Sequence, residues 1–174
     1  MLKHSVHPVR YVTFSAMFAA LIAVATAYLP HLHIPFAGGH TCVHLGDSVI
    51  YLCASLLPTG YACIAAAIGG CLADMLCGST FWAPFSFVIK ALVALCFTAK
   101  SDKILAKRNF CAIAGACLIT VLGYYAAEGI LFGNFITPVH SIPANVIQSV
   151  AGGILYVVIG LILDKTHLKK QIHL

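Results

Sequence analysis

Long apolar segments that are nearly free of charge constrain this chain more than any other feature. Six of them can be delimited, at residues 11–29, 45–58, 60–78, 82–99, 110–132 and 143–163. Only 9% of the residues are charged, whereas soluble domains carry about 25%, so the outer surface must face lipid. A span needs about 20 residues, and a chain of 174 residues accommodates six. The sequence therefore predicts an all-α integral membrane protein, a single domain over residues 1–174 with six transmembrane helices.

The positions of the basic residues predict the orientation. Nine of the ten lie before the first segment, between the fourth and fifth, or after the sixth: Lys3, Arg10, Lys100, Lys103, Lys107, Arg108, Lys165, Lys169 and Lys170. These three places share one side of an even-numbered bundle, and loops rich in Lys and Arg face the cytoplasm. Both termini are therefore expected to be cytoplasmic.

Four ionisable residues lie inside the segments, where a charge is costly and indicates a function. At about 1.5 Å per residue, Asp47, Asp74 and Glu128 fall near the outer ends of their helices. The fourth, Lys90, falls near the midplane. Because the cytoplasmic half offers no comparable set, we expect a polar cavity that opens outward and binds a small polar solute. A buried pair of Asp74 and Lys90 that only fixes helix packing is the alternative.

Two amide side chains add to this outer set. Asn145 and Gln148 are three residues apart on one face of the sixth segment, at its outer start. Interhelical hydrogen bonds that hold the bundle together are the alternative interpretation for both residues.

The outer connection at residues 30–44 is rich in Pro, Gly and His, which predicts an irregular lid in which Phe36 plugs a pocket. Its histidines, His31, His33, His40 and His44, lie close to Cys42. Their spacing matches no strict template, so we assign no metal and no cofactor, and a metal or haem site stays a minor alternative. Nucleophile elbows, phosphate loops and paired catalytic carboxylates are absent from the sequence. The chain is therefore not expected to be an enzyme or to hydrolyse ATP.

Small residues form a stripe on the first segment. Ala16, Ala20 and Ala23 belong to a series of alanines, several of them four residues apart, which lets another helix approach closely. The partner is either a neighbouring segment of this chain or another membrane subunit.

Several motifs together resemble one transporter family. They are VHLGD at 43–47, GCLAD at 70–74, IKAL at 89–92, GYYAAE at 123–128, GN at 133–134 and IPANVIQ at 142–148. In this order they are similar to the substrate-binding S components of energy-coupling factor (ECF) transporters, in the riboflavin/pyridoxine-type branch. The resemblance covers nearly the whole chain.

The resemblance implies a six-helix subunit in the plasma membrane of a prokaryote. It implies capture of a vitamin or related micronutrient outside the cell and delivery through a transmembrane coupling subunit and two ATPase subunits. The implied substrate-binding residues are His44, Asp47, Asp74, Trp82, Lys90, Glu128, Asn134, Asn145 and Gln148. Ala16 and Ala20 match the family's docking motif for the coupling subunit, with Ala23 one turn further. The first loop, rich in His and Cys, departs from the family pattern, so haem, a corrin or a metal chelate stays an alternative ligand.

Two other classes of function compete with this interpretation. A self-sufficient channel or small secondary transporter needs polar residues along both halves of the bundle, and here the inner half is nearly bare. A small membrane enzyme needs a catalytic constellation, and the sequence contains none. Transport measured with and without ATPase partners separates an S component from a channel.

Overall fold

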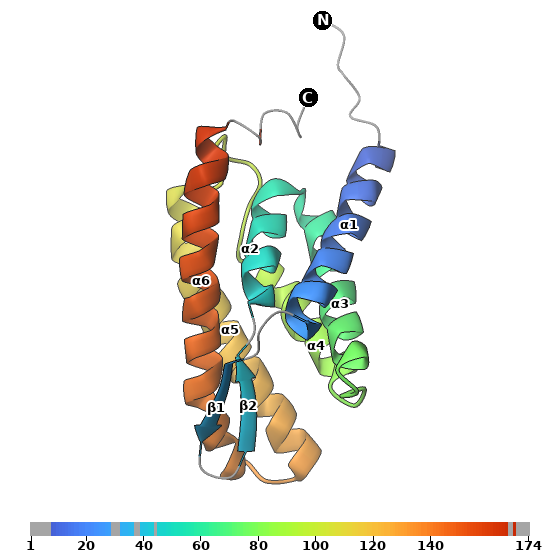
Figure 1. Ribbon diagram of the computed structural model, residues 1–174, viewed down its shortest axis with the longest axis vertical. Helices are drawn as coiled ribbons and strands as arrows, with labels where there is room; N and C mark the ends of the chain where they lie inside the picture. The colour runs from blue at the N-terminus through green and yellow to red at the C-terminus, as the bar shows by residue number, and fades with distance from the viewer. Residues whose placement is uncertain (1–7, 29–31, 37–38, 44, 167–168, 170–174) are drawn as a thin grey trace, which may run out of the picture.

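A computed structural model describes residues 8–28, 32–36, 39–43, 45–166 and 169 (Figure 1). The described residues form six α-helices, one antiparallel pair of strands and a short 3-10 helix. In chain order these are α1 Pro8–Ala27, β1 Leu32–Phe36, β2 Gly39–Val43, α2 Gly46–Leu56, α3 Thr59–Leu76, α4 Ala83–Leu95, α5 Lys107–Phe132, η1 Thr137–Ser141 and α6 Ile142–Lys165. Each apolar segment of the sequence overlaps one of the six helices.

Four of the described helices are long and apolar enough to cross a membrane. They are α1, α3, α5 and α6, the last counted together with η1. The other two, α2 and α4, have 11 and 13 residues. A helix rises about 1.5 Å per residue, so neither is long enough as a helix to cross a hydrocarbon core of about 30 Å. The helical fold is confirmed, and four candidate spans support a membrane protein.

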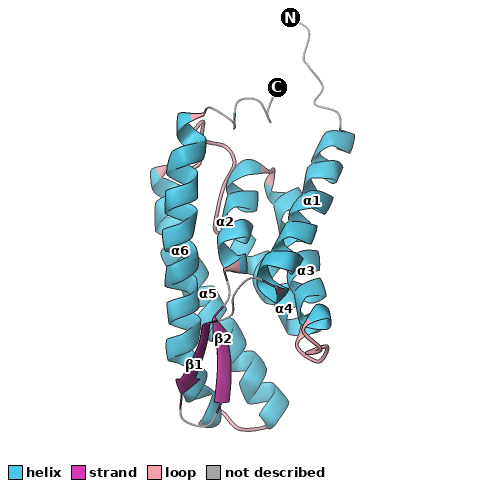
Figure 2. Cartoon of the chain, in the orientation of Figure 1, coloured by secondary structure: helices cyan, strands magenta, loops and turns pink. Residues whose placement is uncertain are grey.

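The first long connection differs from the prediction. Its described residues, 32–36 and 39–43, are regular: β1 and β2 pair as an antiparallel hairpin whose register runs from Leu32 opposite Val43 to Phe36 opposite Gly39. Pairing satisfies backbone groups that an irregular loop would leave for water. Pro35 is tolerated because both strands of a two-stranded sheet are edges. The hairpin follows the axis of the bundle below α2, and β2 contacts α6 (Figure 2).

Two ends of the bundle can be distinguished. At one end, here the basic end, α1 begins, α6 ends and the connection between α4 and α5 passes (Figure 1). This end carries Arg10, Lys100, Lys103, Lys107, Arg108 and Lys165. The opposite end, here the hairpin end, carries β1, β2, η1 and the connection between α3 and α4.

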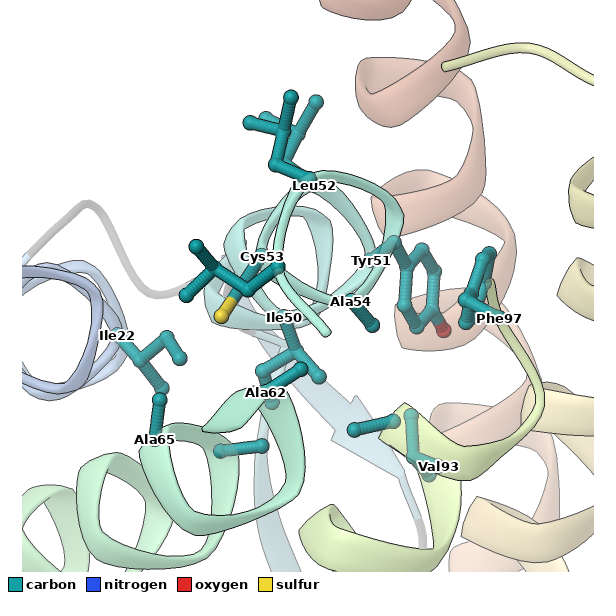
Figure 3. Packing of buried hydrophobic residues seen from close by; sticks show 14 of the residues in the cluster. Ile22, Ile50, Tyr51, Leu52, Cys53, Ala54, Ala62, Ala65, Val93 and Phe97 are labelled. Atoms are coloured by element: carbon teal, nitrogen blue, oxygen red, sulfur yellow. The ribbon is translucent and has the colours of Figure 1, made fainter. Parts of the chain in front are cut away.

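The short helix α2 lies at the centre. All its residues except Val49 are buried, and it contacts α1, α3, α4 and α6. Tyr51 of α2 stacks on Phe97 with ring centroids 4.8 Å apart, and both belong to the main hydrophobic cluster (Figure 3). The surrounding helices expose large apolar side chains such as Ile64 and Leu122. Lipid is the solvent that such a surface suits.

Helices α1 and α3 approach each other closely at Gly69. A Cβ atom there would lie 2.7 Å from the Ile22 Cβ atom and 2.8 Å from the backbone oxygen of Ala19. We therefore expect Gly69→Ala to lower the free energy of unfolding by about 1–3 kcal/mol through overpacking, measured by thermal or chemical unfolding in detergent.

Gly60 at the start of α3 is the matched control, because a Cβ atom there meets nothing within 4 Å. Gly60→Ala should leave stability unchanged or raise it slightly. Equal stability of the two variants would contradict close packing of α1 on α3.

Candidate functional site

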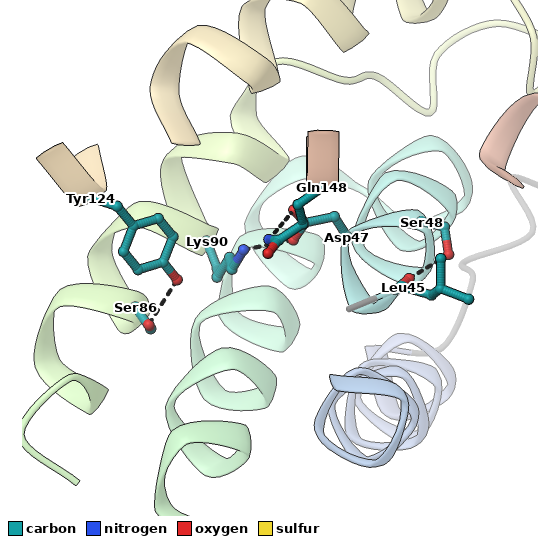
Figure 4. Close-up of polar contacts among 7 residues, drawn as sticks. All are labelled: Leu45, Asp47, Ser48, Ser86, Lys90, Tyr124 and Gln148. Atoms are coloured by element: carbon teal, nitrogen blue, oxygen red, sulfur yellow. Dashed lines mark hydrogen bonds and ion pairs between the residues drawn. The ribbon is translucent and has the colours of Figure 1, made fainter. Parts of the chain in front are cut away.

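A buried ion pair lies at the centre of the bundle (Figure 4). The Lys90 ammonium donates to Asp47 Oδ1 at 2.6 Å, and the two side chains are 3% and 0% exposed. The Gln148 amide donates to Asp47 Oδ2 at 2.9 Å. These contacts join the start of α2 to the middle of α4 and the first half of α6. Because buried charges are tolerated only when paired and hydrogen-bonded, this cluster fixes the three helices relative to one another.

Lys90 is enclosed on its other sides as well. Its ammonium lies 5.4 Å from the centroid of the Tyr124 ring of α5, within the range of a cation–π interaction. The Tyr124 hydroxyl and Ser86 Oγ are hydrogen-bonded at 2.9 Å. Ser86 lies four residues before Lys90, on the same face of α4. Three helices therefore contribute to the surroundings of one lysine.

Two glycines let the backbone approach this ion pair. A Cβ atom at Gly70 of α3 would lie 2.7 Å from the Lys90 Cγ atom. A Cβ atom at Gly152 of α6 would lie 3.1 Å from the Asp47 Cβ atom and 3.3 Å from the Ser48 backbone nitrogen. Larger residues would separate α3 from α4 and α6 from α2. These glycines therefore allow the helices to pack closely around the ion pair.

The ion-pair partner differs from the alternative considered for the sequence. Lys90 pairs with Asp47, and Asp74 interacts with it only at longer range. Asp74 Oδ2 is buried and has no hydrogen-bond partner among the described residues. Ser86 lies close enough to interact with the Asp74 carboxyl group, although Oδ2 does not meet hydrogen-bond geometry, and Lys90 attracts the carboxyl group at longer range. A hydrogen-bond acceptor without a partner is thus held close to a buried ion pair.

Three other residues singled out in the sequence lie outside the ion pair itself. Asn145 is buried on α6, three residues before Gln148. Trp82 lies at the start of α4 with its ring centroid 6.1 Å from that of Tyr124. Glu128 of α5 interacts with Ser141, toward the hairpin end.

Asn134 lies apart from the ion pair, and the side chains of the loop histidines lie outside the described part of the chain. Asn134 is exposed and bonds locally, to the Thr137 hydroxyl at 3.1 Å and to the Ile136 N–H at 2.8 Å. His31 and His44 lie outside the described residues, and His33 and His40 are described only by their backbone in β1 and β2. No group of three His, Cys, Asp or Glu that could hold a metal occurs in the part of the chain that is described.

Sequence reasoning missed Ser86 and Tyr124 as neighbours of the ion pair. The available signal was helical spacing: Ser86 is four residues from Lys90, and Tyr124 is four residues from Glu128. Neither residue is charged, so neither stood out in an apolar segment.

The basic end contains a neutral polar network, although the sequence predicted an inner half that is nearly bare of polar residues. The Asn109 amide is completely buried and donates to Ser55 Oγ and to the backbone oxygens of Thr98 and Ile104. Its side-chain oxygen accepts from the Thr98 N–H at 2.9 Å. The Tyr156 hydroxyl adds bonds to Ser55 and Ile104. The network carries no charge. Through the backbone of Thr98 and Ile104 it ties the helices to the connection between α4 and α5, which closes this end.

A carboxylate anchors the same connection to α6. Asp164 accepts hydrogen bonds from the N–H groups of Ile104 at 2.7 Å and Leu105 at 3.1 Å. Lys169 lies nearby, 3.5 Å from the Lys103 backbone oxygen. Burial lowers the pKa of Lys169, and the negative charge of Asp164 opposes this shift.

An apolar groove of about 410 Å³ runs between α1 and α3. Its lining is Val12, Ser15, Ala16, Ala19, Ala20, Tyr61, Ile64, Ala65, Ile68 and Leu72. Ala16 and Ala20 are exposed in this groove, whereas Ala23 is buried with 3% of its surface exposed. The alanine stripe therefore has an outward part and an inward part.

Breaking the ion pair on one side should be costly. We expect Lys90→Met to lower the free energy of unfolding by about 3–5 kcal/mol, because Asp47 would keep a buried charge without its cation. The measurement is chemical or thermal unfolding in detergent.

The double variant Asp47→Asn with Lys90→Met is the matched control. It removes both charges and keeps an acceptor for Gln148, so it should recover most of the lost stability. Wild-type stability of Lys90→Met alone would show that the pair does not hold the helices together.

Comparison with known proteins identifies one family. The model of the family described as "ECF-type riboflavin transporter, S component" matches residues 7–165. None of the curated proteins matches the chain.

Proposed function

The chain belongs to the family of ECF-type riboflavin transporter S components, and on that premise we propose that it captures a vitamin outside the cell for ATP-driven uptake. It is a membrane transport subunit and not an enzyme. Riboflavin is the first ligand to test, since the family is described by it. The observation that carries the proposal is the family match over residues 7–165.

In the proposed topology, residues 1–174 form one domain that crosses the plasma membrane of a prokaryote six times. The basic end faces the cytoplasm, in agreement with the preference of Lys and Arg for that side. The position of the start of α1 and the end of α6 at this end supports an even number of crossings (Figure 1). In the two short crossings, α2 and α4 cover part of the depth and the adjoining connections cover the rest.

The proposed ligand site lies between the ion pair and the hairpin end. Asp74 offers a buried acceptor without a partner, which suits an N–H or O–H donor on the ligand. Trp82 supplies an aromatic face near Tyr124. The other members of the set are His44, Glu128, Asn134 and Asn145. Asp47, Lys90 and Gln148 form the floor of the site and hold its walls in place.

The proposed docking face for the ECF transmembrane coupling subunit is the groove between α1 and α3. Its lining is apolar and is exposed on the side of Ala16 and Ala20. Small side chains allow a partner helix to approach closely, where van der Waals packing is the main attraction in lipid. Two ATPase subunits, bound to the coupling subunit, would then power release of the ligand.

The purified chain should bind riboflavin by itself, as measured by quenching of riboflavin fluorescence in detergent. Asp74→Asn should weaken binding about 10- to 100-fold, which corresponds to a hydrogen bond to a charged group of about 1.5–3 kcal/mol. Asp102→Asn, the same change at an exposed residue of the basic end, should leave affinity unchanged.

Two results would contradict this assignment. Unchanged affinity of a folded Asp74→Asn variant would remove Asp74 from the site. A folded wild-type chain that does not quench riboflavin would exclude riboflavin as the ligand, and titration with haem would then test the main alternative.

Bulky residues in the groove should separate docking from ligand binding. Ala16→Trp and Ala20→Trp should keep riboflavin affinity and lose copurification with the coupling subunit, because a large ring fills the space of the partner helix. Met17→Trp is the matched control: Met17 is 48% exposed and does not line the groove. Normal copurification of both alanine variants would show that docking occurs elsewhere, and lost riboflavin affinity would show that these alanines support the fold.

A further inference from the structure

Three completely buried hydroxyl groups have no hydrogen-bond partner among the described residues. They belong to Tyr51 of α2, Thr120 of α5 and Ser149 of α6, each with 0% of its surface exposed. A buried hydroxyl without a partner costs about 1–3 kcal/mol, so three in one small bundle need a physical explanation.

The three hydroxyls lie on the basic-end side of the ion pair. Tyr51 follows Asp47 by four residues, and Thr120 precedes Tyr124 by four, so each lies one helical turn from a residue around the ion pair. Ser149 directly follows the glutamine that bonds Asp47. Because α5 runs opposite to α2 and α6, all three steps lead toward the basic end (Figure 1). The Tyr51 hydroxyl also interacts with Ser149, although the two do not meet hydrogen-bond geometry.

The polar layers on both sides of these hydroxyls are bonded. Toward the hairpin end, Asp47 bonds Lys90 and Gln148. Toward the basic end, one turn beyond Tyr51, Ser55 and the Asn109 network are bonded. The middle layer is the exception in a column of three polar layers that follows one face of α2. The middle layer therefore holds hydroxyl groups whose hydrogen-bonding capacity the described residues do not use.

We propose that an ordered water molecule binds between Tyr51, Thr120 and Ser149 and bridges their hydroxyls. A buried water makes about three hydrogen bonds to groups that otherwise have no partner. Each hydroxyl donates one bond and accepts others, so three hydroxyls can satisfy both protons of a water and one of its lone pairs. The water would connect α2, α5 and α6 directly beneath the ion pair.

The alternative is a dry layer, and it predicts stability changes of opposite sign. With water bound, Tyr51→Phe, Thr120→Val and Ser149→Ala each remove a bond and should lower the melting temperature by about 2–4 °C. In a dry layer each variant removes an unpaired polar group and should raise it. Phe keeps the stacking on Phe97, so loss of ring packing does not confuse the result.

Tyr28→Phe is the control, since Tyr28 is 68% exposed and its variant should melt as wild type does. A fall in at least two of the three buried variants supports the water site, and any other outcome overturns it. A high-resolution structure is the direct test: density within hydrogen-bond distance of all three oxygens is expected, and its absence overturns the proposal.

Discussion

The ion pair of Asp47 and Lys90 is the interaction on which the rest of this bundle depends. A charge in a lipid-embedded core needs a partner, so one lysine determines how three helices meet. The pair places α2 at the centre, draws α4 toward it and, through Gln148, holds α6. Gly70 and Gly152 allow this geometry because a larger residue would push the helices apart. The hairpin precedes α2, which begins next to Asp47, so the pair also fixes the helix that follows the hairpin.

The two ends of the bundle differ in a way that suits capture without free passage. On the hairpin side of the ion pair, Asp74 keeps a buried acceptor without a partner. On the basic side, Asn109 and Tyr156 both bond to Ser55 and to the backbone oxygen of Ile104, in the connection between α4 and α5, and the network is complete. In the proposed function, a solute is recognised from the hairpin side, and its passage to the basic side requires rearrangement of this network. The groove between α1 and α3 provides a surface on which a partner could drive that change.

The helices could be predicted because lipid leaves few choices: apolar runs of this length become helices, and the helix bounds agree with the apolar segments within a few residues. The partner of Lys90 could not, because Asp47 and Asp74 are equally good acceptors until the packing of α2 is known. Asn109, Ser55 and Tyr156 were missed since neutral groups do not stand out by charge. The hairpin was missed because its sequence, rich in Pro and Gly, favours irregular loops, and only pairing along the axis of the bundle orders it.

Uptake into sealed vesicles tests the account most directly. The chain is reconstituted alone, or with the coupling subunit and ATPases of the same organism, and accumulation of labelled riboflavin is followed with and without ATP. The account predicts no accumulation by the chain alone, even with bound riboflavin, and accumulation with ATP only when all partners are present. Uptake by the chain alone would contradict it, since a binding subunit that is closed at its basic end cannot act as a channel or an independent transporter.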